Sequence, residues 1–205
     1  MDPAPDYRER RTLRTRGELA RVGLELFAAY GYDETSVDDI VAAVGVVERT
    51  FFRHFPAKED IALAVQGDVD RAFLEALEAR PVGEPPAGAL RHAALASWGS
   101  FGAVLNGAVP VSLGLRALAL VESTAGLLGV ALLRSRETEN AAARIVAERE
   151  GLDVDIDPRP RIVAAVYGGL IRSAVRVWGK GADRSPEGLR EALEGCLVGV
   201  QAQSR

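Results

Sequence analysis

The segment VVERTFFRH, residues 46–54, carries the side chains of this sequence that are best suited to contact nucleic acid. On a helix, Glu48, Arg49, Thr50 and Arg53 would be exposed, with Phe51 turned toward the core. An arginine such as Arg49 can form a bidentate contact with guanine, while hydroxyl and imidazole groups can contact phosphate. The alternative is that these arginines are solvated surface charges, as most arginines on helices are.

The sequence contains few residues of the types that carry out catalysis. It contains two histidines, His54 and His92, and one cysteine, Cys196. We find no paired His/Cys/Asp cluster, no glycine-rich phosphate loop and no metal-ligand spacing. The single cysteine excludes an internal disulfide framework and suits a reducing cytoplasm. We therefore expect no enzyme, no metal and no cofactor, and a small helical enzyme is the least favoured alternative.

The charge balance limits how this chain could bind nucleic acid. The 205 residues include 25 Lys+Arg and 29 Asp+Glu, a net charge of −4. Residues 1–60 contain nine basic and twelve acidic residues, so this part is also acidic, at −3. Proteins that coat nucleic acid through bulk positive charge are excluded. Affinity would have to come from a few placed cations, Arg49, Arg53 and Lys58, and from helix N-termini.

Two short helices are expected to position these side chains. Ser36 is a suitable N-cap, and Asp38 and Asp39 suit the first turn of a helix that ends at Gly45. A third helix, 47–54, follows almost at once and ends before Pro56. Two helices joined by a tight glycine turn are typical of a helix-turn-helix.

The remaining pattern is helical throughout, which predicts an all-α fold of about nine helices. A first helix over 13–30 would begin with a capping box of Thr15 and Glu18. The Pro-rich segment PVGEPPA, residues 81–87, separates helices. Residues 92–115 contain no Asp, Glu, Lys or Arg, but polar residues and a break from Asn106 to Pro110 favour a buried helix and turn over a membrane span. The other helices are expected at 57–77, 88–105, 112–122, 124–150, 159–179 and 186–203.

Residues 15–65 resemble the DNA-binding domain of the TetR family of bacterial transcription regulators. The resemblance is carried by LF-three residues-GY, TSVDDI, AxxVGV, RTFFRHF and PAKED, in that order and at the family's spacing. It implies a three-helix head over 1–56, with a flexible basic arm at 1–12, and a helical ligand-binding and dimerisation domain over 57–205. It also implies a cytoplasmic homodimer that binds a palindromic operator in double-stranded DNA and represses until a small effector releases it.

The resemblance assigns individual residues to DNA contact. Arg49 would read bases, with Glu48 beside it. Phe52 replaces the family's common tyrosine and so lacks the phenol that would bind phosphate, while Val47 and Ala57 replace polar caps. These departures and Glu48 leave open a helical interaction module that has lost specific DNA binding. The full expected set is Thr35, Ser36, Glu48, Arg49, Thr50, Phe52, Arg53, His54 and Lys58.

The basic arm before the motif has two interpretations. It could reach a minor groove or flanking phosphates, or be a solvated tail. Its arginines are Arg8, Arg10, Arg11, Arg14 and Arg16.

The C-terminal two-thirds is expected to hold the dimer interface and an effector pocket. Residues 161–178 are apolar nearly all round, which requires cover on more than one side. The interface set is Val163, Val166, Leu170, Val177, Leu189, Leu193, Cys196, Leu197 and Val200. The pocket set is Trp98, Phe101, Leu105, Arg116, Leu120, Leu127, Leu128, Tyr167 and Ile171, which suits a small hydrophobic effector. The layout resembles the subgroup with acyl-CoA-like ligands. For every one of these residues the alternative is a place in the ordinary core.

Overall fold

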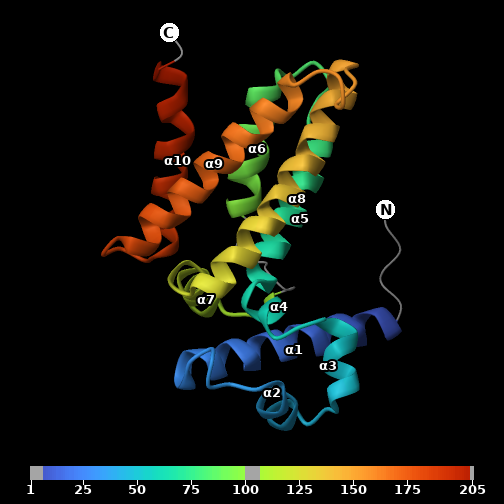
Figure 1. Cartoon of the computed structure of the whole chain (residues 1–205), viewed down its shortest axis with the longest axis vertical. Coiled ribbons are helices and arrows are strands. Elements are labelled where there is room, and N and C mark those ends of the chain that lie inside the picture. The colour runs from blue at the N-terminus through green and yellow to red at the C-terminus, as the bar shows by residue number, and fades with distance from the viewer. Residues whose placement is uncertain (1–6, 100–106, 204–205) are drawn as a thin grey trace. The chain divides into compact units, whose positions relative to one another are not determined.

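The computed structural model describes residues 7–99 and 107–203, and the side chains of 10–99 and 107–197. These residues form ten helices and no strand, so the all-α prediction is confirmed (Figure 1). The chain divides into two compact units. The first comprises the described parts of 1–68 and 102–121, and the second those of 69–101 and 122–205. The expected boundary at residue 56 stays a prediction.

The first unit contains the N-terminal head. Helix α1 (Tyr7–Tyr30) packs against α2 (Val37–Val44) and α4 (Glu59–Ala62), and α2 contacts α3 (Glu48–His54). Gly23 allows this close approach, because a Cβ there would lie 2.8 Å from Ile61 Cδ1. The core of the head consists of fully buried apolar side chains, among them Leu19, Ile40, Phe51, Phe55 and Ile61.

Two helix boundaries in the head differ from expectation. Helix α1 begins at Tyr7, so residues 7–12 are helical. The Thr15 hydroxyl donates to the Arg11 carbonyl at 3.0 Å, within the helix, so Thr15 is not an N-cap. The helix expected over 57–77 is broken at Leu63, which separates α4 from α5 (Ala64–Glu78).

The second unit is built around α9 (Arg159–Lys180), which contacts α6 (Pro86–Gly99), α8 (Ala125–Glu150) and α10 (Pro186–Gln203). Its core joins side chains from all of these helices and from α5: Phe73, Leu77, Leu90, Val146, Tyr167 and Leu197. Ser185 caps α10 as predicted, since its hydroxyl accepts from the Gly188 amide at 3.1 Å.

Helix α7 (Val111–Ser123) belongs for most of its length to the first unit. Its Arg116 donates to the carbonyl of Ala28 on α1 at 3.4 Å. This charged hydrogen bond connects the middle of the chain to the C-terminal end of α1.

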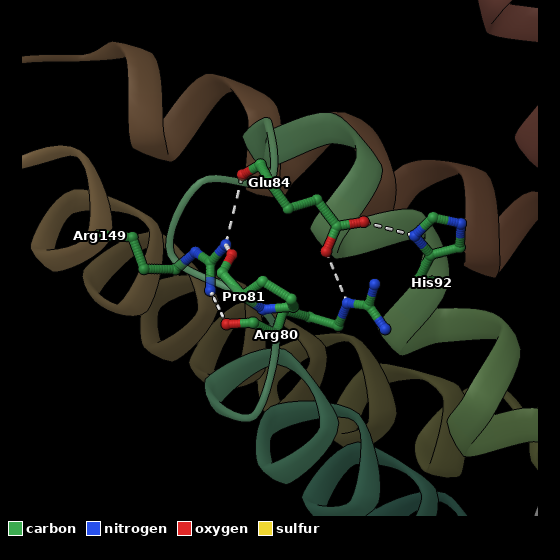
Figure 2. Close-up of polar contacts among 5 residues, drawn as sticks. All are labelled: Arg80, Pro81, Glu84, His92 and Arg149. Atoms are coloured by element: carbon green, nitrogen blue, oxygen red, sulfur yellow. Dashed lines mark hydrogen bonds and ion pairs between the residues drawn. The ribbon is translucent and has the colours of Figure 1, made fainter.

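The Pro-rich connection between α5 and α6 is fixed by charged hydrogen bonds (Figure 2). Arg149 of α8 donates to the carbonyls of Arg80 at 2.7 Å and Pro81 at 2.6 Å. Glu84 accepts from Arg80 Nε at 2.6 Å and lies 2.5 Å from His92 Nδ1. The Arg80 hydrogen bond, assisted by the one from His92, holds the pKa of Glu84 below its usual value.

Candidate nucleic-acid interface and cavity of the second unit

The turn between α2 and α3 sets the direction of α3. Gly45 adopts φ +76°, a left-handed conformation that glycine takes without strain. Its amide, and that of Val46, donate back to the Val41 carbonyl at 2.9 and 3.0 Å. At the other end of α2, Ser36 and Asp39 form a capping box, which confirms the expected N-cap.

Helix α3 buries one face and exposes the other. Phe51 is fully buried, whereas Glu48, Arg49, Phe52 and Arg53 are exposed. Thr50 and His54, both half-buried, flank this exposed surface.

Arg49 differs from Arg21 of the same head in having no partner among the described residues. It makes no hydrogen bond or ion pair with any residue in the described part of the chain. In contrast, Arg21 donates to both carboxylate oxygens of Glu25, at 2.7 and 2.9 Å. The guanidinium of Arg49 therefore has its donors available for a base edge or a phosphate.

Neighbouring groups and burial shift the pKa values of two side chains of α3. A hydrogen bond with the Asp38 carboxyl, together with its negative charge, raises the pKa of Glu48. Partial burial lowers the pKa of His54, and the positive charges of Arg53 and Arg16 lower it further. His54 is therefore neutral at pH 7 and could offer a phosphate one N–H.

Thr35 and Ser36, at the start of α2, were expected to contact DNA, but their hydroxyl groups form hydrogen bonds within the head. Thr35 is 2% exposed, and its hydroxyl donates to the Gly31 carbonyl at 2.7 Å. The Ser36 hydroxyl donates to Asp39 at 2.6 Å. Both hydroxyl hydrogens are thus engaged within the head, and we leave these two side chains out of the proposed DNA surface.

The side chain of Lys58 also forms its hydrogen bonds within the head. Its ammonium donates to the carbonyls of Tyr32, at 2.7 Å, and Thr35, at 2.8 Å. Burial, with the charges of Glu59, Asp33 and Asp60, raises the pKa of Tyr32 to about 12. Lys58 therefore connects the start of α4 to the α1–α2 connection, a role that sequence reasoning missed because it depends on contacts distant in sequence.

The arginines of the N-terminal arm divide into two groups. Arg10, Arg11 and Arg14 are exposed on the first turns of α1. Arg16 instead lies 5.2 Å from the centre of the Phe55 ring and 3.7 Å from the Asp68 carboxylate. Among the described side chains of the arm, the first group remains available to reach DNA beside the head, and the side chain of Arg8 lies outside the described residues.

A cavity opens within the second unit, between α5, α6, α8 and α9. Its empty volume is about 440 Å³, including space open to solvent. Trp98 and Ile171 of the expected pocket set line it. The other lining residues are Val69, Asp70, Phe73, Ser97, Ser135, Thr138, Glu139, Ala142, Ala164 and Gly168.

The other described residues of the expected pocket set do not line this cavity. Tyr167 is in the core, where burial raises the pKa of its phenol. Arg116 and Leu120 belong to the first unit, and Leu127 and Leu128 do not line the cavity. Phe101 and Leu105 lie outside the described residues.

Glu139, which lines the cavity, is paired with an arginine of α9. Arg172 of α9 donates to the carboxylate of Glu139 on α8 and, at 2.9 Å, to the hydroxyl of Ser135. Gly168 makes room for this carboxylate, because a Cβ at 168 would lie 2.7 Å from Glu139 Cδ. Two consecutive helical glycines, 168 and 169, were the available signal for such a close approach.

One face of α9 exposes apolar side chains toward both ends of the helix, with the exposed Ser173 and Arg176 between them. Ile162, Val166 and Val177 are 59%, 43% and 63% exposed, and Ala165 is exposed with them. Their spacing places them on one side of the helix over about four turns. By length and hydropathy α9 could also cross a membrane, a property that buried and interface helices share.

The expected dimer-interface set is thus split between this face and the core. Leu189, Leu193 and Leu197 are buried within the subunit. Val163, Leu170 and Cys196 are half-buried, and the side chain of Val200 lies outside the described residues. Ile162 was missed, although its spacing from Val166 indicates the same face.

Comparisons with known proteins identify relatives of this chain. Residues 19–65 match the family described as bacterial regulatory proteins of the tetR family, and residues 84–201 match the MftR C-terminal domain. The HTH-type transcriptional regulator TcmR of Streptomyces glaucescens is 45% identical over 97% of this chain and 88% of its own length. A putative mycofactocin biosynthesis transcriptional regulator, MftR of Mycobacterium tuberculosis, is 44% identical over 25% of this chain and 26% of its own. A solved TetR-family transcriptional regulator from Pectobacterium atrosepticum is 20% identical over 95% of this chain and 94% of its own, with a TM-score of 0.49.

Proposed function

Because this chain belongs to the TetR family and is a DNA-binding transcription regulator, we propose that it acts as a homodimeric repressor. In this proposal α3 reads a palindromic operator, and a small molecule in the cavity of the second unit releases the DNA. The observation that carries it is the exposed guanidinium of Arg49, which has no partner among the described residues, on a helix whose opposite face is anchored by Phe51. A bacterial regulator of this kind acts in the cytoplasm, where its DNA is.

The proposed DNA-contacting surface consists of five side chains of α3. Arg49 is its principal reader, since arginine suits the O6 and N7 acceptors of guanine. Arg53 and the half-buried Thr50 and His54 suit the phosphates on either side. Phe52 adds exposed apolar area where a thymine methyl could lie.

The acidic character of the head favours selectivity over bulk affinity. Asp38, Asp39 and Glu48 are exposed close to α3 and repel DNA wherever the placed cations do not contact it. Binding to unrelated DNA would then be weak, and the salt dependence would correspond to few released counterions.

The exposed apolar face of α9 supports the homodimer. The exposed apolar side chains on the first turns and near the end of α9 need cover, and a second copy of the same helix supplies it through two-fold symmetry. Such a dimer would present its two α3 helices to half-sites about one DNA turn apart, which is why we expect a palindromic operator.

Release by a ligand would act through α5. Val69, Asp70 and Phe73 of α5 line the cavity, and the same helix begins in the first unit. To move such a switch from 1:99 to 99:1, a ligand must favour the released state by about 5.5 kcal/mol.

An alanine substitution of Arg49 tests the proposal. Duplexes that bind the full-length chain are first selected from a randomised library, and dissociation constants are measured by anisotropy for the selected duplex and its single base-pair variants. We expect Arg49→Ala to lose about 1–3 kcal/mol of discrimination at one base pair. Arg190→Ala is the control, because Arg190 pairs with Glu187 and Glu194 within α10.

Two outcomes would contradict the proposal. If Arg49→Ala retains full discrimination at every position, Arg49 is not the base reader. If the wild-type chain selects no sequence from the library, the interaction module without specific DNA binding becomes the better description.

A further inference from the structure

Helix α3 carries one acidic side chain, Glu48, at the end of the helix where a base edge is expected. The helix begins at Glu48, and both Glu48 and Arg49 are exposed there. In helix-turn-helix proteins the N-terminal residues of the second helix contact base edges. With α3 in the major groove, the carboxylate of Glu48 is therefore brought to the bases together with the guanidinium of Arg49.

The Glu48 carboxylate has no cation that offsets its charge within the described part of the chain. Its neighbour is the carboxyl of Asp38, whose hydrogen bond and negative charge raise the pKa of Glu48. Asp39, in contrast, is engaged in the capping box of α2, where its carboxylate accepts from the Ser36 amide at 2.9 Å. Glu48 thus differs from Asp39 in having acceptor oxygens that remain available beside the first turn of α3.

A carboxylate that enters the major groove distinguishes strongly between base edges. Its transfer out of water is costly unless a donor replaces the lost hydration. Guanine presents two acceptors in this groove, and thymine presents an acceptor and a methyl group, so neither base supplies a donor. Adenine presents an amino group beside its N7 acceptor, whereas cytosine presents its N4 amino group without an acceptor on the same base. The edge of cytosine therefore suits a carboxylate best.

Asp38 strengthens this preference for a donor edge. It is exposed on the first turn of α2 and places a second negative charge next to Glu48. An acceptor edge at this place would face two carboxylates, while an amino group would satisfy one of them. Arg49 has the opposite requirement, and it faces a different edge because consecutive residues of a helix do not share a face.

We propose that Glu48 determines specificity by accepting a hydrogen bond from the N4 amino group of one cytosine in each operator half-site. The inference rests on the proposed function in taking α3 as the reading helix, and it adds Glu48 to the proposed DNA-contacting surface. Any other base leaves the carboxylate without a suitable donor. The same side chain that repels unrelated DNA thus gains a partner on the operator.

Two substitutions of Glu48 separate base selection from simple repulsion. The duplex selected by the wild-type chain and its single base-pair variants are titrated by anisotropy with full-length wild type, Glu48→Ala and Glu48→Gln. We expect wild type to prefer cytosine at one position by about tenfold, and Glu48→Ala to lose this preference while it binds unrelated DNA more tightly. Glu48→Gln should change the preferred base to adenine, because a side-chain amide pairs with N6 and N7 of adenine. Glu18→Ala, which removes an exposed carboxylate from α1, is the matched control and should keep the cytosine preference.

A modified base tests the amino group directly. N4-methylcytosine still pairs with guanine, but its methyl group takes the place of the N4 hydrogen that faces the major groove. At the selected cytosine it should weaken wild-type binding by about tenfold and leave binding by Glu48→Ala unchanged. The same modification at a cytosine outside the half-sites is the control and should affect neither protein.

The inference is overturned if Glu48→Ala tightens binding to every duplex by the same factor, because Glu48 then only repels DNA. It is overturned equally if wild type tolerates N4-methylcytosine at every cytosine of the half-sites. If Arg49→Ala loses discrimination while Glu48→Ala keeps all of it, the proposed function stands and only the role of Glu48 fails. A changed base preference in Glu48→Gln with full discrimination in Arg49→Ala supports Glu48 and contradicts Arg49 as the base reader. A wild-type chain that selects no sequence contradicts both.

Discussion

The ammonium of Lys58 donates to the Tyr32 carbonyl at 2.7 Å and lies 4.2 Å from the centre of the Tyr32 ring. One cation thus connects the first residue before α4 to the connection between α1 and α2, by a charged hydrogen bond and a cation–π contact. The family resemblance alone had assigned Lys58 to the DNA backbone. Its position makes it first a stabilising residue of the head.

Substitution of Lys58 by methionine should therefore lower stability. Two carbonyls would lose a charged donor, and we expect a loss of about 1–3 kcal/mol in the free energy of unfolding, measured by urea denaturation. The salt dependence of operator binding should keep its slope, since a lost phosphate contact would change it by about 0.9. The other lysine of the sequence, Lys180, is exposed at the end of α9, and Lys180→Met is the control. If Lys58→Met keeps the stability of the wild type and reduces the slope of the salt dependence, Lys58 contacts the DNA backbone.

Phe52 should read thymine through its methyl group. The side chain is 50% exposed on α3 and cannot donate to phosphate. Replacing one critical thymine of the selected duplex by uracil should weaken wild-type binding by about 0.8 kcal/mol, roughly fourfold. Phe52→Ala should bind both duplexes equally, whereas Tyr30→Ala, which removes an aromatic 70% exposed at the end of α1, should keep the difference. Equal wild-type affinity for every uracil duplex would exclude this contact.

Val177 should be part of the dimer interface. Val177 adds exposed apolar area near the C-terminal end of this face, and a carboxylate there would have to be desolvated on association, so Val177→Asp should separate the subunits. Light scattering after gel filtration should then give a mass near 21.8 kDa rather than twice that value. Val82→Asp, at a valine 74% exposed in the α5–α6 connection, is the matched control and should remain dimeric. A dimeric Val177→Asp protein would place the interface elsewhere.

Glu84 should make stability depend on pH. The pKa of Glu84 is lowered in the folded chain by Arg80 first and by His92 second. The stabilisation that Glu84 contributes is therefore fully present above its unfolded-state pKa of about 4.3. It is lost as pH falls through the lower pKa that Glu84 has in the folded chain. Glu84→Gln should have a lower urea midpoint than wild type at pH 7, and the difference should shrink below about pH 4. Glu137→Gln, outside this cluster, should show neither effect; a constant difference for Glu84→Gln at all pH values would contradict the assignment.

The helices and the DNA-binding head could be predicted from local sequence. Ser36, Gly45 and Ser185 mark helix ends because caps and left-handed glycines act within a few residues. The same local logic failed at Thr15, whose i−4 hydrogen bond is equally compatible with a helix interior, and at Leu63, where α4 and α5 separate.

The identity of individual contacts could be predicted only in part. Periodicity separated the buried Phe51 from the exposed Arg49, since one helix face determines both. It could not show that Thr35 and Lys58 satisfy groups inside the head, because their partners lie on other elements.

By itself, the sequence determined the all-α class and the helix-turn-helix, and it predicted α3 as the reading helix, because these follow from spacing within short segments. The tertiary structure alone decided which apolar residues of α9 and α10 are core and which are exposed, and which polar groups line the cavity. Leu193 and Val177 look alike in a helical pattern, yet one is 1% and the other 63% exposed. Burial and hydrogen-bond partnership depend on which helices pack together, and that packing joins residues far apart in the chain.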